Sequence, residues 1–323
     1  MRAVVCTEFG PLDRLVVEER EPPVAGEGNV VVAVHAAGVN YVDGLICEGR
    51  YQMKPATPFV PGSEIAGEIT AVGPGVESLS VGDRVIAFTG FGGFAEQVAL
   101  PAKSIIPMPA SLDFGQAATL VQSYSTVLFA LTRRTSVVPG EWVLVLGAGG
   151  GIGLAAVDVA RALGARVIAA ASSDARLDAA RAMGAEEVIA YEREDLKTRA
   201  RELSGGGVDV VVDPVGGRHS EAALRATRLF GRFCVIGFAA GSIASIPLNL
   251  VLLQNRALVG VEWGGWAIQD AAGNAELFAE LLAMIEDGRL HPTSPATFAL
   301  ADAPAVMAGL IGRSIDGKVV LVP

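Results

Sequence analysis

The sequence predicts an α/β protein in which a doubly wound parallel sheet is joined to an irregular β domain. In residues 141–176 a buried strand, a glycine-rich turn, a helix and a second strand follow one another, which is the pattern of a βαβ unit. Strands and helices alternate from there to residue 262, as is typical of a parallel sheet. Residues 1–110 instead show short strand patterns between Gly and Pro turns.

The N-terminal part is expected to consist of strands, with no helix of useful length before Ser111. Turn residues separate seven strand patterns there. These patterns span residues 1–7, 15–19, 29–37, 64–72, 83–88, 94–100 and 103–107. Ser111 is a capping residue that begins a helical pattern over 111–118, and we place the domain boundary near Val121.

Hydrophobic periodicity predicts the remaining elements. We expect strands at residues 142–146, 165–170, 188–191, 208–213, 233–237 and 258–262. We expect helices at residues 126–133, 154–163, 174–183, 195–202, 220–227, 274–288 and 303–311. A last strand at 317–322 is expected to return to the first domain, because a strand that follows a doubly wound sheet can complete an earlier one.

The glycine-rich turn has the spacing G-x-x-G-x-x-G at Gly147, Gly150 and Gly153. Glycines allow a close backbone approach, and the helix N-terminus offers free N–H groups and partial positive charge, so the turn favours a pyrophosphate. We expect Gly149, Gly150, Gly151 and Ile152 to bind a dinucleotide in a Rossmann domain. The alternative is a tight structural turn with no ligand.

The residues after the second strand bear on the choice of dinucleotide. An NAD-selecting acid is absent from this place, where Ser172, Ser173 and Arg176 stand instead. Two hydroxyls and a guanidinium suit the 2′-phosphate of NADPH. Alternatively, Ser172 caps the next helix and Arg176 is solvated.

Composition excludes several other classes of protein. The chain has 323 residues, a formal charge of −10 and a pI near 4.9, which argues against binding to nucleic acids or anionic membranes. No apolar run reaches the ~18 residues of a membrane helix. Residues 1–6 already show a strand pattern, so we expect no signal peptide and a cytoplasmic protein. The three cysteines are widely separated and predict no disulfide framework.

Several motifs together resemble the medium-chain dehydrogenase/reductase superfamily, and most closely its zinc-independent NADPH:quinone oxidoreductase (zeta-crystallin-like) family. They lie at residues 39–43, 61–67, 81–85, 92–96, 147–153 and 317–321. The resemblance implies a GroES-like β-barrel catalytic domain over residues 1–121 and 263–323, and a Rossmann NADPH-binding domain over 122–262. It also implies a homodimer, joined through an edge strand near residues 257–261.

The resemblance also implies a site without a metal. Zinc members of the superfamily carry Gly-His-Glu where this chain has Gly62, Ser63 and Glu64, and they have a four-cysteine lobe that this chain lacks. Only three histidines are present, and zinc needs three or four nitrogen, sulfur or carboxylate ligands. We therefore expect no zinc.

Site residues are assigned by matching this family. Arg176 and Tyr191 correspond to the residues that bracket the 2′-phosphate, and Asn40 corresponds to an Asn beside the nicotinamide. The remaining cofactor residues implied by the resemblance are Thr126, Gly237, Phe238, Trp263, Gly264 and Lys318.

The implied catalytic residues are Asn40, Tyr41 and Asp43. Tyr41 is either a catalytic phenol or a packing residue, and Asp43 is either a proton relay or a turn former. Some relatives have a tyrosine where this chain has Leu45, so no catalytic tyrosine is assigned there.

The predicted reaction is hydride transfer from NADPH to a quinone or an α,β-unsaturated carbonyl in a cleft between the domains. One alternative is an enoyl-thioester reductase, in which basic residues such as Arg133 and Arg134 would meet coenzyme A phosphates. A second alternative is a protein that binds NADPH without catalysis.

Overall fold

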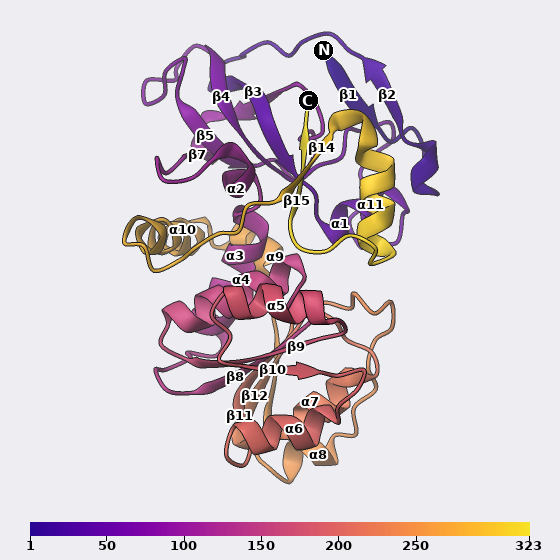
Figure 1. Cartoon of the computed structure of the whole chain (residues 1–323). Helices are drawn as coiled ribbons and strands as arrows, with labels where there is room; N and C mark the ends of the chain where they lie inside the picture. Colours follow the sequence, from indigo (N-terminus) through magenta and orange to yellow (C-terminus); the bar gives the residue numbers. More distant parts are fainter. The chain divides into compact units, whose positions relative to one another are not determined.

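The computed structural model describes residues 1–323 and divides into two compact units. Unit 1 comprises residues 1–122 and 293–323, and unit 2 comprises residues 123–292. Figure 1 labels most of the elements of both units.

Unit 1 is built on a seven-stranded sheet with the order β14-β15-β3-β4-β5-β7, in which β6 also pairs with β3. The strands are β3 (Asn29–Gly38), β4 (Glu64–Val72), β5 (Arg84–Phe88), β6 (Gln97–Pro101), β7 (Ile105–Pro107), β14 (Ala296–Ala299) and β15 (Val319–Val322). β1 (Arg2–Val5) and β2 (Val16–Glu19) form a separate antiparallel ribbon. The C-terminal strand β15 pairs with β3, which is the expected return of the tail to the first domain.

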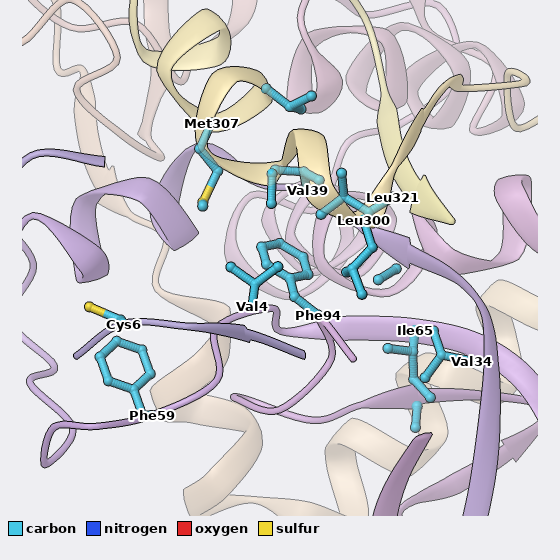
Figure 2. Close-up of a cluster of buried hydrophobic side chains, with 14 of the residues drawn as sticks. Val4, Cys6, Val34, Val39, Phe59, Ile65, Phe94, Leu300, Met307 and Leu321 are labelled. Carbon is cyan, nitrogen blue, oxygen red and sulfur yellow. The ribbon is translucent and has the colours of Figure 1, made fainter. Parts of the chain in front are cut away.

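The core of unit 1 joins residues from both ends of the chain. Figure 2 shows Val4, Phe59 and Phe94 in one cluster with Met307 and Leu321. These side chains are at most 9% exposed. Burial of apolar area on this scale holds the C-terminal segment on the N-terminal sheet.

Unit 1 contains three helices, α1 (Tyr41–Cys47), α2 (Phe114–Ala118) and α11 (Ala303–Ile311), besides short 3₁₀ turns. The expectation of no helix before Ser111 was wrong because of α1. This helix is short and contains Gly44, which weakens a helical pattern. The structure explains the glycine, since a Cβ there would lie 2.7 Å from Ile311 Cδ1 of α11.

Unit 2 contains the predicted Rossmann sheet. Its six parallel strands have the order β10-β9-β8-β11-β12-β13. They are β8 (Trp142–Leu146), β9 (Arg166–Ala171), β10 (Glu187–Ala190), β11 (Val208–Asp213), β12 (Thr227–Val235) and β13 (Ala257–Gly260). The order reverses at β8 and β11, and ligands bind beyond the carboxyl ends of strands at such a switch point.

Helices cover both faces of this sheet (Figure 1). α4 (Gly151–Ala162) and α5 (Asp174–Ala182) pack on one face, and α6 (Leu196–Leu203) and α7 (His219–Ala226) pack on the other. α3 (Val121–Leu128) runs into a π-helical segment, Phe129–Arg134. The remaining helices are α8 (Asn249–Leu252), α9 (Trp263–Gln269) and α10 (Ala271–Glu286). None of the helices is long and apolar enough to cross a membrane.

Residues 263–292, which the sequence placed with the first domain, belong to unit 2. Trp266 stacks on Phe129 with ring centroids 4.4 Å apart. The backbone N–H of His291 donates to Asp158 in α4 at 2.7 Å. These contacts hold α9, α10 and the segment after them on the Rossmann unit, and the amphipathic pattern of α10 alone does not reveal which unit it covers.

Candidate functional site

The glycine turn after β8 is closely packed backbone. Gly147 has φ +60°, and a Cβ on Gly153 would lie 2.2 Å from the Gly147 carbonyl oxygen. Gly150 is the N-cap of α4 and is exposed. Because the turn residues next to α4 are glycines, no side chain of the turn covers the first N–H groups of the helix. A phosphate-binding helix N-terminus needs this access.

Arg176 lies over this turn. A Cβ on Gly149 would lie 2.4 Å from Arg176 Cβ, so only glycine allows the arginine to pass there. Arg176 Nη1 donates to Ser172 Oγ at 2.8 Å. Ser173, not Ser172, caps α5 by accepting from the Arg176 N–H. The alternative in which Ser172 caps the helix was wrong.

Tyr191 follows β10, next to the strand that ends before Ser172. Its ring centroid lies 4.2 Å from that of His219, the first residue of α7. Arg218, the residue before His219, forms an ion pair with Glu192 at 2.6 Å. Its positive charge is therefore already compensated by a carboxylate of the protein. Ser172, Arg176 and Tyr191 thus lie at the carboxyl ends of two neighbouring strands of unit 2.

Four other predicted cofactor residues lie in two further segments of unit 2. Gly237 and Phe238 form the loop after β12, and Phe238 is 41% exposed. Trp263 begins α9 and is buried, and its Nε1 donates to Asn274 Oδ1 at 3.0 Å. Gly264 follows Trp263 in the first turn of α9. The indole of Trp263 therefore holds α9 on α10.

Thr126 lies on α3 and is only partly buried. The predicted residues of the glycine turn and those after β9 and β10 lie together in unit 2, because they follow the carboxyl ends of the three adjacent strands β8, β9 and β10. Gly237 and Phe238 follow β12 on the same side of the sheet, two strands away from β8.

In unit 1, Asn40 belongs to a buried polar network. Its Nδ2 donates to Glu64 Oε1 at 2.9 Å, and the Gln122 N–H donates to Glu64 Oε2 at 2.9 Å. Lys318 Nζ donates to the Thr119 carbonyl oxygen at 2.8 Å. Glu64 is fully buried and Lys318 is 9% exposed. The network joins the end of β3, the start of β4, the α2–α3 junction and the residue before β15.

Asp43 and Ser63 extend the network. Asp43 Oδ2 accepts from the Asn40 N–H at 2.8 Å, across the first turn of α1. Ser63 Oγ donates to Gln122 Oε1 at 3.0 Å and also hydrogen-bonds to the Asp43 carboxyl. Asp43, Ser63 and Gln122 therefore form one hydrogen-bonded chain beside Asn40.

Burial shifts the titration of these groups. Burial raises the pKa of Asp43 to about 7, with hydrogen bonds from Asn40 and Ser63 acting against the shift. Burial also raises the pKa of Glu64, and the Lys318 charge opposes this. The pKa of Lys318 falls to about 8, again because of burial, with Glu64 acting in the opposite direction. Tyr41 is the first residue of α1 and is half-buried.

The sequence interpretation missed Glu64, Ser63, Gln122 and Thr119 as members of this network. Glu64 carried a usable signal, because an acid at the start of an otherwise apolar strand needs a partner. The backbone groups of Thr119 and Gln122 carry no such signal, since any residue type supplies them.

Comparisons with known proteins place the chain in a family. Residues 26–110 match the family model described as an alcohol dehydrogenase GroES-like domain, and residues 151–285 match that described as a zinc-binding dehydrogenase. The quinone oxidoreductase-like protein 2 of Bos taurus is 40% identical over 99% of this chain and 92% of its own length. The chain belongs to the quinone oxidoreductase family of the medium-chain dehydrogenase/reductase superfamily.

Solved structures of quinone oxidoreductases share the fold over the whole chain. The Thermus thermophilus enzyme, also solved in complex with NADPH, has a TM-score of 0.86 and 34% identity, with 100% of both chains covered. The Escherichia coli enzyme, complexed with NADPH, has a TM-score of 0.89 and 28% identity, again with 100% of both chains covered. The predicted fold class, a GroES-like domain with a Rossmann sheet, is confirmed.

The donor set of this quinone oxidoreductase family member does not fit zinc, although one matched family description names that metal. Nowhere in residues 1–323 do three His, Cys, Asp or Glu side chains come close enough together to hold a metal ion. Ser63 and Asn40 are not among the side chains that bind zinc in proteins.

Proposed function

We propose that this protein is an NADPH-dependent oxidoreductase that reduces a quinone or an α,β-unsaturated carbonyl without zinc. Its family membership supports the reaction class, and the NADPH complexes of the two solved relatives support the cofactor. The observation that carries the proposal is Arg176, which is bonded to Ser172 and lies directly over the glycine turn.

The residues of unit 2 would hold NADPH. The turn formed by Gly149, Gly150, Gly151 and Ile152 would bind its pyrophosphate at the N-terminus of α4. Within this turn the Gly150 N–H donates to the Gly147 carbonyl oxygen at 2.9 Å, so the N–H groups of Gly151 and Ile152 are the donors that the helix end offers. Arg176 and the Ser172 hydroxyl bind the 2′-phosphate, with Tyr191 as a flat shelf beside them. The hydrogen bond between Ser172 and Arg176 fixes the guanidinium in advance, which lowers the entropy cost of binding.

NADPH, when bound, supplies the hydride. Unit 1 contributes Asn40, which has one amide N–H on Glu64 and retains a second N–H for a ligand. That N–H can stabilise the oxyanion that develops on a quinone or enone oxygen. Asp43 has a pKa near neutrality and a hydrogen-bonded chain to Ser63, so it can hold a proton close to Asn40 and Tyr41.

The alternative of an enoyl-thioester reductase loses its main support. Arg133 pairs with Glu280 at 2.8 Å, and Arg134 Nε donates to the Gly260 carbonyl oxygen at 3.1 Å. Both guanidinium groups are therefore engaged inside unit 2, which disfavours them as receptors for coenzyme A phosphates. A protein that binds NADPH without catalysis is the remaining alternative, and a turnover assay separates it from the proposal.

The assembly we propose is a homodimer joined through β13. This strand is the edge of the Rossmann sheet, and Leu258 on it is 41% exposed. Exposed apolar side chains also lie on neighbouring elements, namely Phe230 on β12, Leu252 at the end of α8 and Leu253 directly after it. An edge strand with open N–H and C=O groups and apolar side chains favours pairing with another chain.

The test is NADPH oxidation at 340 nm by the purified protein with three acceptors: a small naphthoquinone, a linear enone and crotonyl-CoA. The proposal predicts turnover with the quinone or the enone. Turnover with crotonyl-CoA alone would favour a thioester reductase. NADPH binding without turnover of any acceptor would favour the non-catalytic alternative.

A further inference from the structure

Glu64 and Lys318 carry opposite charges and are both buried in unit 1, whereas charged residues normally lie on the surface. Burying an ion is costly unless it is compensated by charge and hydrogen bonds. Both compensations are present here. Glu64 accepts N–H groups from Asn40 and Gln122, and Lys318 donates to the Thr119 carbonyl oxygen, three residues before Gln122 in the same segment. The positive charge of Lys318 opposes the effect of burial on the Glu64 carboxyl.

The carboxylate fixes which way the Asn40 carboxamide faces. An ionised carboxylate only accepts hydrogen bonds, so the atom 2.9 Å from Glu64 Oε1 must be Asn40 Nδ2. The other oxygen, Oε2, is held by the Gln122 N–H, so Glu64 cannot turn away. The amide carbonyl oxygen and the second N–H of Asn40 therefore have fixed directions.

This arrangement depends on the charge of Glu64. A protonated carboxyl would carry an O–H on one oxygen. That O–H would face the N–H of Asn40 or of Gln122, and two donors that face each other cannot form a hydrogen bond. Burial drives the carboxyl toward that protonated form, and Lys318 opposes it. Lys318 itself is held in place by its hydrogen bond to the Thr119 carbonyl oxygen.

We propose that Lys318 keeps Glu64 ionised, and that ionised Glu64 is the positioning residue that orients the Asn40 carboxamide toward its ligand. The inference rests on the proposed function, in which Asn40 contacts the acceptor or the nicotinamide. It gives Lys318 a role inside unit 1 and not on the cofactor.

Asp43 is the other titratable group that acts in this network. Its carboxyl repels Glu64, and its protonation near pH 7 relieves the repulsion. Lys318 loses its proton as the pH rises through about 8. The orientation of Asn40 should therefore be maintained at neutral pH and weaken above pH 8.

The test uses the variants Lys318→Met and Glu64→Gln and the double variant that combines them. Glu68→Gln is the control. Glu68 lies on the same strand, β4, and is only partly buried, so it controls for the substitution itself. We expect kcat with the acceptor to fall about 10- to 100-fold in both single variants, since misorientation of a contacting group has effects of this size. KM for NADPH should change little, and Glu68→Gln should behave as wild type.

A second readout needs no substrate. The side-chain amide resonance of Asn40 is assigned by its loss in Asn40→Ala and followed by NMR from pH 5 to 9. In wild type it should show one change near pH 7, where Asp43 titrates, and a further change near pH 8, where Lys318 titrates. In Lys318→Met it should move at lower pH, as Glu64 takes up a proton.

An Asn40 resonance and a kcat that match wild type in folded Lys318→Met or Glu64→Gln would overturn the inference. If one of the two single variants does not fold, the other still tests the inference, because each variant removes one of the two charges. Absence of turnover in wild type would contradict the proposed function alone, since the NMR comparison still decides the role of the two charges.

Discussion

Arg176 determines the choice of cofactor in this account. Arg176→Ala should weaken NADPH far more than NADH, because it removes a charge-assisted contact worth on the order of 1.5–3 kcal/mol. This corresponds to a loss of roughly 10- to 150-fold in kcat/KM for NADPH. Steady-state kinetics with both cofactors measure it. An equal loss for NADPH and NADH would show that Arg176 does not contact the 2′-phosphate.

A matched control exists on the same helix. Arg181 also lies on α5 but pairs with Asp178 at 2.7 Å on the exposed side. Arg181→Ala removes the same charge without touching the glycine turn, so it should leave the NADPH preference unchanged.

The sequence was enough to name the residues of the proposed cofactor site, but it was not enough to predict which of them form hydrogen bonds with one another. Ser172 and Arg176 could be singled out because their polar groups follow a predicted strand at the position where cofactor selection occurs. The hydrogen bond between them could not, since Ser173 has the same side chain and lies closer to Arg176 in sequence. Only the backbone at the start of α5 makes Ser173 the cap and leaves Ser172 for the guanidinium.

Helix α1 presents Asn40 and Tyr41, and its first turn depends on Asp43. The raised pKa of Asp43, about 7 in the folded protein against an ordinary 3.8, gives stability a pH dependence. Between these values the folded state binds more protons than the unfolded state, so this carboxyl lowers stability as the pH rises.

Asp43→Asn should remove that effect, because an amide resembles the protonated acid and does not ionise. Relative to wild type, the variant should gain about 1 kcal/mol or more in unfolding free energy between pH 5 and pH 8. Urea unfolding at both pH values measures the difference. Asp13→Asn, at an exposed acid of the same unit, is the control. A pH-independent difference for Asp43→Asn would contradict the shift.

Most strands and the longer helices were predictable, and a few short elements were not. The expected strands at residues 64–72 and 208–213 and the helix at 303–311 match β4, β11 and α11 in both bounds. α1 was missed because seven residues with an internal glycine carry little periodicity. β14 was missed because a four-residue strand forms only by pairing with β15, which lies twenty residues later.

The division of the whole molecule depends on contacts that sequence patterns do not encode. The first division between the units falls at residues 122 and 123, close to the expected Val121. The second lies about thirty residues beyond the expected residue 263, at 292 and 293, because tertiary packing of α9 and α10 decides it.

Assembly through β13 can be tested by charge. Leu258→Lys places a charge on the edge strand, where it should prevent pairing of two sheets without disturbing the fold. Size-exclusion chromatography with light scattering should give a dimer for wild type and a monomer for the variant. Val24→Lys, at an 83% exposed residue of unit 1, should remain dimeric. A wild-type monomer would contradict the proposed assembly.

The central claim is that the protein uses NADPH to reduce a quinone-like acceptor. The most direct measurement is the initial rate of cofactor oxidation with a small naphthoquinone, using NADPH and NADH at equal concentrations. The account predicts acceptor-dependent oxidation that is at least about ten-fold faster with NADPH, since the 2′-phosphate contact is worth more than about 1.4 kcal/mol. Equal rates with NADH, or no acceptor-dependent oxidation with either cofactor, would contradict it.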